Sequence, residues 1–182
     1  MPDLTSGYWQ VELTPRACKA AAFCTRKGLF KWNVMPFGLC NAPATFQRLM
    51  DRVLAGLQWE TCLVYLNDII VLGRDGTEML ERLSQVFTRL LEANLKLKPA
   101  KCCLFQEKVA YLGHIVSAKG VAIDPEKVKK AAGWPAPCNI SEVRQFVRLA
   151  SYYRRFVENF ATIAKPLHEL TKKYARFNWT EE

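Results

Sequence analysis

The sequence lacks the features on which membrane, secreted and zinc-binding proteins depend. No run approaches the length of about 18 apolar residues that a membrane-spanning helix needs, and no signal-peptide pattern follows Met1. Histidine occurs only twice, and the seven cysteines form no Cys-x-x-Cys pair, so zinc-binding spacing is absent. The odd number of cysteines, several of them within apolar runs, indicates reduced thiols. We therefore expect an intracellular protein, cytoplasmic or nuclear, without membrane contact.

The sequence is rich in apolar residues and has an excess of positive charge. Half of the 182 residues are hydrophobic and 24% are charged, which is typical of a globular chain and not of a disordered one. The length suits one domain, or one domain with a small helical appendage. The net charge of +9 favours a polyanionic partner, but a basic protein without such a partner would have the same balance.

The most informative stretch is residues 63–72, in which two apolar, β-prone runs flank the polar pair Asn67-Asp68. Asn and Asp tolerate positive φ, so this pair suits the two-residue turn of a β-hairpin. A plain hairpin more often has Gly in its turn. The stretch therefore predicts a hairpin that presents the Asp68 carboxylate from a buried scaffold.

A second carboxylate, Asp3, opens another strand-like stretch, residues 3–11, with a bend at Gly7. If the two strands lie in one sheet, Asp3 and Asp68 can hold a divalent cation through oxygen ligands. Metal ions paired about 4 Å apart are a common device of phosphoryl and nucleotidyl transfer. Periodicity alone does not show that these strands are neighbours.

Four short motifs, in order along nearly the whole chain, resemble those of the reverse transcriptases of Ty3/gypsy-class long-terminal-repeat retrotransposons. Residues 65–68 (Tyr-Leu-Asn-Asp) resemble the Tyr-x-Asp-Asp box, with Asn67 in place of its first Asp. Residues 3–8 resemble the first catalytic strand, residues 34–47 the template-side motif, and residues 111–114 (Tyr-Leu-Gly-His) the primer grip. Four ordered matches are far more specific than a single one.

The resemblance implies an α+β fold with two parts. Residues 1–123 would form a palm, an antiparallel sheet packed by helices, and residues 124–182 a small helical thumb or connection. The thumb would lead towards a ribonuclease H domain that the sequence does not contain, and the fingers region ahead of the palm would be missing.

Local patterns predict the main elements. We expect a hairpin around Gly28 within residues 20–34, and helices over about 43–57 and from an N-cap at Thr77. A strand should cover residues 109–116, with a bend or a close approach of another backbone at Gly113. Further helices should begin at Asp124 and at Asn139, where a glutamate three residues on completes a capping box.

The resemblance also implies roles for individual residues. Asp3, Asp68 and the degenerate position Asn67 would form the catalytic set, with the two aspartates as ligands of two Mg²⁺ (or Mn²⁺) ions. Lys101 is a candidate for protonating the pyrophosphate leaving group. The remaining residues would contact substrates: Tyr8, Phe37, Gly38 and Gln47 the incoming nucleotide, Tyr111, Leu112 and Gly113 the primer, and Arg154 and Arg155 the nucleic acid.

Some of these residues also have a plainer interpretation. Tyr8 suits a core aromatic beside a bend, and Lys101 suits a solvated basic turn. Residues 125–182 carry 11 Lys or Arg against 6 Asp or Glu. Within them, the basic and aromatic stretch at Arg154-Arg155 fits phosphate contacts with stacking or, equally, a helix with snorkelling arginines.

By resemblance, the activity is RNA-directed DNA polymerisation, the addition of deoxynucleoside triphosphates to a primer on an RNA or DNA template. Partners would be the template–primer duplex and the rest of a Pol polyprotein, such as ribonuclease H and integrase. Asn67 contributes no negative charge, so we predict catalysis impaired by orders of magnitude. Two alternatives remain open: a non-catalytic nucleic-acid-binding remnant, and a domesticated interaction module.

Overall fold

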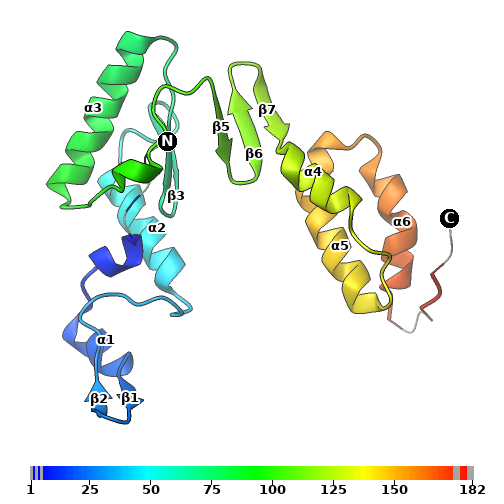
Figure 1. Cartoon of the computed structure of the whole chain (residues 1–182), viewed down its shortest axis with the longest axis horizontal. Coiled ribbons are helices and arrows are strands. Elements are labelled where there is room, and N and C mark those ends of the chain that lie inside the picture. Colours follow the sequence, from blue (N-terminus) through cyan, green and yellow to red (C-terminus); the bar gives the residue numbers. More distant parts are fainter. Residues whose placement is uncertain (1, 3, 5, 174–176, 180–182) are drawn as a thin grey trace. The chain divides into compact units, whose positions relative to one another are not determined.

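The computed structural model describes residues 2, 4, 6–173 and 177–179, and its chain divides into two compact units, Met1–Gln106 and Glu107–Glu182 (Figure 1). The sequence predicted that the palm ends and the thumb begins after residue 123. The boundary between the two compact units lies earlier in the chain, after Gln106. The strands that follow residue 107 pack with helices further along the chain, which places them in the second unit. The assignment of palm and thumb to these residues stays a prediction.

The first unit combines short antiparallel strand pairs with two longer helices, in agreement with the predicted α+β class. Its elements are η1 (Gly7–Gln10), α1 (Pro15–Ala20), β1 (Phe23–Thr25), β2 (Gly28–Phe30), α2 (Ala42–Val53), β3 (Cys62–Tyr65), β4 (Asp68–Val71), α3 (Gly76–Glu92) and η2 (Pro99–Lys101). β1 pairs with β2, which confirms the hairpin expected around Gly28, and β3 pairs with β4. The short helix α1 was not predicted, because six residues are too few for a recognisable period.

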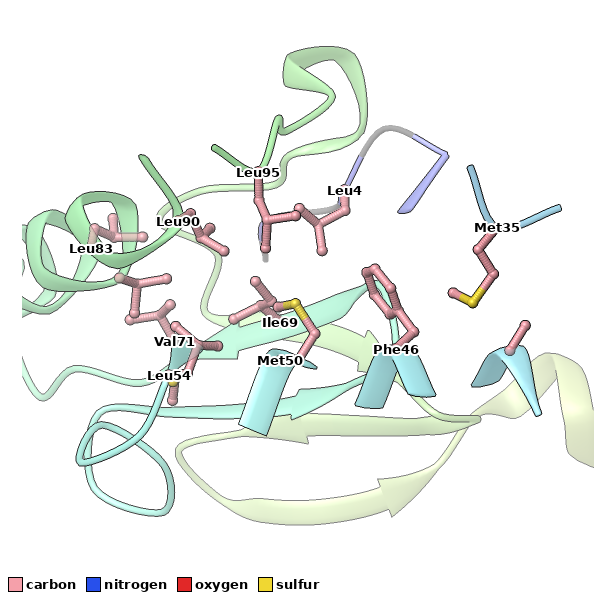
Figure 2. Close-up of a cluster of buried hydrophobic side chains, with 13 residues drawn as sticks. Leu4, Met35, Phe46, Met50, Leu54, Ile69, Val71, Leu83, Leu90 and Leu95 are labelled. Atoms are coloured by element: carbon pink, nitrogen blue, oxygen red, sulfur yellow. The ribbon is translucent and has the colours of Figure 1, made fainter. Parts of the chain in front are cut away.

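The core of the first unit lies between α2, α3 and the β3–β4 hairpin (Figure 2). Fully buried side chains there are Phe46 and Met50 of α2, Leu54 at the C-cap of that helix, Ile69 of β4, and Val86 and Leu90 of α3. Burying a side chain of this size stabilises the fold by about 1.5–3 kcal/mol. The hairpin is therefore fixed against two helices, as the scaffold of a site should be.

The N-terminus of α3 differs from its prediction. The N-cap is Asp75 and not Thr77, and the Asp75 carboxylate accepts a hydrogen bond of 2.8 Å from the backbone N–H of Glu78. Glu78 in turn accepts from the backbone N–H of Arg74 at 2.6 Å. This reciprocal arrangement resembles a capping box, and it begins the helix two residues earlier than predicted.

The second unit contains a three-stranded antiparallel sheet followed by helices. Its elements are β5 (Lys108–Tyr111), β6 (His114–Ser117), β7 (Gly120–Ile123), α4 (Pro125–Ala132), α5 (Ile140–Tyr152), η3 (Arg154–Phe156) and α6 (Phe160–Leu170). β6 lies between β5 and β7. The continuous strand predicted over 109–116 is wrong: where a bend at Gly113 was expected, the chain reverses fully at Leu112 and Gly113, whose φ angles of 50° and 77° make a tight hairpin turn.

Both predicted helix starts in the second unit are confirmed. The Asp124 carboxylate caps α4 by accepting from the backbone N–H of Glu126 at 3.0 Å. The Asn139 side chain caps α5 by accepting from the backbone N–H of Glu142 at 3.0 Å, and the Glu142 carboxylate reaches back to the backbone N–H of Cys138 at 2.7 Å. Such caps fix where each helix begins.

The seven cysteines are free thiols, and two of them, Cys18 and Cys62, are buried. Burial raises the pKa of the Cys62 thiol, which keeps it protonated and inert. Among the described residues, no helix combines the length and the apolar character needed to cross a membrane.

Candidate active site

The β3–β4 hairpin turns at Leu66-Asn67 and not at the predicted pair Asn67-Asp68. Tyr65 pairs with Asp68 across the strands, which leaves Leu66 and Asn67 as the two turn residues. Leu66 has a φ of 52°, a conformation that leucine rarely adopts. The half-buried Asp68 is consequently the first residue of β4, so its carboxylate belongs to a paired strand next to the turn.

The first residues of the chain lie alongside this hairpin. The backbone N–H of Ile69 donates to the Pro2 carbonyl at 3.2 Å, and the backbone N–H of Leu4 donates to the Asn67 carbonyl at 3.4 Å. The predicted ligand Asp3 itself lies outside the described residues. Its two neighbours in the sequence, Pro2 and Leu4, nevertheless bond to the hairpin on either side of Asp68. The sequence alone could not show that these two segments are adjacent.

The Asn67 side-chain oxygen is buried and has no hydrogen-bond donor among the described residues. It faces Gly7 closely: a Cβ added to Gly7 would lie 2.2 Å from Asn67 Oδ1 and 2.7 Å from Phe46 Cζ. A buried acceptor without a donor costs about 1–3 kcal/mol, and a charged one costs more. In the absence of a cation this position therefore suits a neutral amide better than a carboxylate.

The side chains at this site offer the oxygen donors that a divalent cation prefers, but they carry little negative charge. The Asp68 carboxylate and the Asn67 amide are the oxygen donors that Mg²⁺ and Mn²⁺ prefer. Within the part of the chain that the structure describes, no three His, Cys, Asp or Glu side chains form a cluster. A cation here would depend on Asp68, on the oxygen of Asn67 and on the predicted contribution of Asp3.

Gln47, predicted to contact the nucleotide, uses its amide to hold the hairpin. Its Oε1 accepts from the backbone N–H of Leu66 at 2.7 Å, and its Nε2 donates to Asp51 Oδ1 at 2.9 Å and to the Val64 carbonyl at 3.4 Å. A helix side chain is thus bonded to the turn and to β3. The predicted nucleotide contact of Gln47 stays a prediction.

Two of the residues predicted at the nucleotide, Tyr8 and Phe37, pack together, and Tyr8 also packs on Phe46 of α2. Tyr8 packs against Phe37 and Phe46, with ring centroids 5.3 Å and 5.4 Å apart. Phe37 is 60% exposed, and Gly38 beside it has a φ of 91° that side-chain-bearing residues rarely adopt. Tyr8 is therefore partly a core residue, as its plainer interpretation held, while Phe37 and Gly38 offer an exposed surface next to it.

In the second unit, the residues predicted to grip the primer form the β5–β6 turn. Tyr111 and His114 pair across the strands, and Leu112 and Gly113 make the turn between them. The rings of Tyr152, Tyr153 and Phe156 surround the imidazole of His114 at centroid distances of 5.3–5.6 Å. The aromatic stretch after α5 therefore packs directly on this turn.

The predicted basic contacts lie on surfaces. Lys101 ends η2 and is exposed, and Arg154 and Arg155 are exposed in η3. The Arg155 guanidinium lies 5.4 Å from the ring centroid of Phe156, a distance suited to a cation–π contact. These positions leave the arginines accessible to a phosphate backbone.

Sequence reasoning missed an aromatic and basic surface on the β1–β2 hairpin. Phe23 stacks on Phe30 and Trp32 at centroid distances of 6.0 Å and 5.2 Å. Residues 13–50 include six Lys or Arg and no Asp or Glu, a signal that a charge count along the chain would have found. The aromatic contacts could not be read from the sequence, because they depend on the hairpin register.

Comparison with known proteins relates the whole chain to one family. The sequence model of the protein family "Reverse transcriptase (RNA-dependent DNA polymerase)" matches residues 2–116 of this chain. The Retrovirus-related Pol polyprotein from transposon 297 of Drosophila melanogaster is 43% identical over 97% of this chain and 17% of its own length. The Transposon Tf2-3 polyprotein of Schizosaccharomyces pombe is 32% identical over 98% of this chain and 13% of its own length. The chain thus spans less than a fifth of these relatives.

Solved structures show the same similarity in three dimensions. A foamy viral protease-reverse transcriptase in complex with double-stranded DNA matches with a TM-score of 0.89 and 28% identity, over 99% of this chain and 32% of that one. The foamy viral enzyme in complex with an RNA/DNA hybrid matches with a TM-score of 0.83 and 28% identity, over 99% of this chain and 25% of that one.

Proposed function

The chain belongs to the reverse transcriptase (RNA-dependent DNA polymerase) family, and from that premise we propose that it is part of an RNA-directed DNA polymerase of a Ty3/gypsy-class retrotransposon. The observation that carries the proposal is the β3–β4 hairpin, which presents Asp68 beside the segment on both sides of Asp3. The reaction is template-directed addition of a deoxynucleotide to a primer 3′-hydroxyl.

In this proposal the chain's own residues bind and orient the reactants. Asp68 and Asp3 would hold two Mg²⁺ ions, with Asn67 contributing a neutral oxygen. Reverse transcriptases generally use divalent ions, which when bound lower the pKa of the primer hydroxyl and neutralise the triphosphate. Gln47 keeps the turn in place, Phe37, Gly38 and Tyr8 would lie against the nucleotide, and Lys101 would supply a proton to the leaving pyrophosphate.

Asn67 makes the proposed polymerase an impaired one. Replacing one of three carboxylates by an amide removes a negative charge from both cation capture and charge neutralisation in the transition state. Its oxygen is also buried against Gly7. We expect nucleotide addition to be slower by orders of magnitude than with aspartate at this position.

Primer extension on an RNA template tests the proposal. The chain and its Asn67→Asp variant would be compared, each alone and with the segment that precedes the matching region in the transposon 297 polyprotein fused ahead of Met1. We expect Mg²⁺-dependent synthesis from the fused Asn67→Asp protein and little from the fused unaltered one. An Asn67→Asp, Asp68→Asn double variant is the matched control, since it keeps the charge and moves it by one residue. Folded proteins without synthesis in any form would overturn the proposal.

A second candidate function is nucleic-acid binding without catalysis. It is supported by the exposed pair Arg154-Arg155, by the net charge of +9, and by the nucleic-acid complexes among the structural neighbours. Binding of this kind is independent of sequence and weakens with salt, because phosphate contacts release counterions. A dissociation constant for duplex DNA that stays unchanged between low and high salt would exclude it.

A further inference from the structure

The β5–β6 turn has a backbone that needs outside support. Leu112 and Gly113 both adopt positive φ, at 50° and 77°. Glycine accepts such a conformation freely, whereas leucine is strained in it by roughly 1 kcal/mol. The turn residues are also at the surface, with Leu112 38% exposed. A turn of this kind persists in one conformation only when neighbouring groups hold it there.

Two consecutive tyrosines at the end of α5 supply that support. The Tyr152 hydroxyl donates to the Leu112 carbonyl at 2.7 Å, and the Tyr153 hydroxyl approaches the Gly113 carbonyl at 3.5 Å. His114 Nδ1 lies 3.0 Å from the same Leu112 carbonyl. Because that carbonyl can only accept, His114 makes this bond when Nδ1 carries the hydrogen. The tyrosines come from 40 residues further along the chain, so these bonds are tertiary ones.

The turn and Tyr153 pack closely at residue 113. A Cβ added to Gly113 would lie 2.9 Å from the Tyr153 hydroxyl oxygen. The φ of residue 113 favours glycine, and a side chain there would have to displace the Tyr153 hydroxyl. The rings of Tyr152 and Tyr153 meet edge to face at a centroid distance of 4.8 Å, so each orients the other.

We propose that Tyr152 and Tyr153 are positioning residues, whose hydroxyls hold the Leu112-Gly113 turn in the conformation that meets the primer strand. The inference rests on the proposed function, since it takes the β5–β6 turn as the primer-contacting surface. The tyrosines act through the turn and do not themselves touch the reacting atoms. Removing a hydroxyl would take one hydrogen-bond donor from a turn carbonyl that keeps its other partner, His114 Nδ1 at Leu112 and the backbone N–H of Asp124 at Gly113. The turn would be held less firmly, which would loosen the primer terminus while the rest of the nucleic-acid surface is retained.

The first test measures the turn itself by amide hydrogen exchange. Tyr152→Phe, Tyr153→Phe and the double variant would be compared with the unaltered chain. Thr162→Val is the matched control, because it removes an exposed hydroxyl from α6 of the same unit. We expect exchange in residues 111–114 to accelerate about tenfold in Tyr152→Phe, as loss of one good hydrogen bond allows, and not in the control. Unchanged exchange in the double variant would overturn the proposal.

The second test measures binding to a DNA duplex with a recessed 3′ end and to a single strand of the same length. We expect Tyr152→Phe to bind the recessed duplex several-fold more weakly and the single strand as before. A general loss of folding would instead weaken both and lower the melting temperature. Faster exchange with unchanged duplex binding would overturn the positioning role. If the unaltered chain bound neither nucleic acid, the proposed function would fail, a different result from the failure of the tyrosines alone.

An experiment on the unaltered chain guards against variants that do not fold. Adding the recessed duplex should slow hydrogen exchange in residues 111–114 more than a blunt duplex does. Equal protection by both duplexes would contradict a role of this turn at the primer terminus.

Discussion

Gln47 and Leu66 are joined by a hydrogen bond of 2.7 Å, in which the side-chain oxygen on α2 accepts from the backbone N–H of the hairpin turn. Leu66 is the residue of this turn with positive φ, so the bond holds the strained backbone position of the β3–β4 turn. The turn that precedes Asp68 is therefore held by a helix and not only by its own strands.

The Gln47 bond predicts a stability effect away from any catalysis. Gln47→Ala leaves the partly buried N–H of Leu66 without an acceptor, which should lower the free energy of unfolding by about 1–3 kcal/mol. Urea denaturation measures it. Arg48→Ala, one residue along the same helix and exposed, should change stability far less. Equal effects of the two substitutions would contradict a special role of Gln47.

Asn67→Asp should make stability depend on divalent cations. A carboxylate at this buried position lacks a described donor, so at neutral pH the variant should be less stable than the unaltered chain in the presence of a chelator. Mg²⁺ should stabilise the variant by binding its folded state, and stabilise the unaltered chain less. Thermal melts at a series of Mg²⁺ concentrations measure this difference. A variant that is as stable as the unaltered chain without Mg²⁺ would contradict the expectation.

Gly7→Ala should destabilise the first unit through overpacking. The added methyl would clash with Asn67 Oδ1 and Phe46 Cζ, at 2.2 Å and 2.7 Å, and a forced shift of this kind typically costs about 1–3 kcal/mol. Gly76→Ala is the control, because a Cβ there meets nothing within 4 Å at the start of α3. Chemical denaturation should show a lower free energy of unfolding for Gly7→Ala and no decrease for Gly76→Ala.

Glu78 should contribute a stabilisation of the fold that is lost at acid pH. Hydrogen bonds from the Arg74 side chain and backbone lower its pKa from 4.5 to about 2. A carboxyl whose pKa is lower in the folded state stabilises the fold above pH 4.5, and loses that contribution as the pH falls towards 2. The difference in melting temperature between the chain and Glu78→Gln should therefore shrink over this range. Glu81→Gln, on the exposed side of α3, should show no comparable trend.

Much of the fold could be predicted because it depends on local signals. The apolar spacing along α2, the caps at Asp124 and Asn139, and the hairpin around Gly28 all follow from short-range chemistry. The predictions failed where the local sequence fits two different structures equally well. Residues 109–116 read as one strand because a leucine at positive φ is not expected, and Tyr152 and Tyr153, which hold the turn there, lie 40 residues away.

The features of the candidate site also fall into those that the sequence predicts and those that only the tertiary structure shows. The sequence by itself determined the kinds of chemistry available: an amide and a carboxylate side by side in one hairpin, a basic balance, and motifs that identify the family. Only the tertiary structure decided that Pro2 and Leu4 bond to the hairpin, that Gln47 holds its turn, and that the oxygen of Asn67 is buried against Gly7. The physical reason is that each of these is a contact between residues far apart in the chain, which hydrophobic packing brings together and no local pattern encodes.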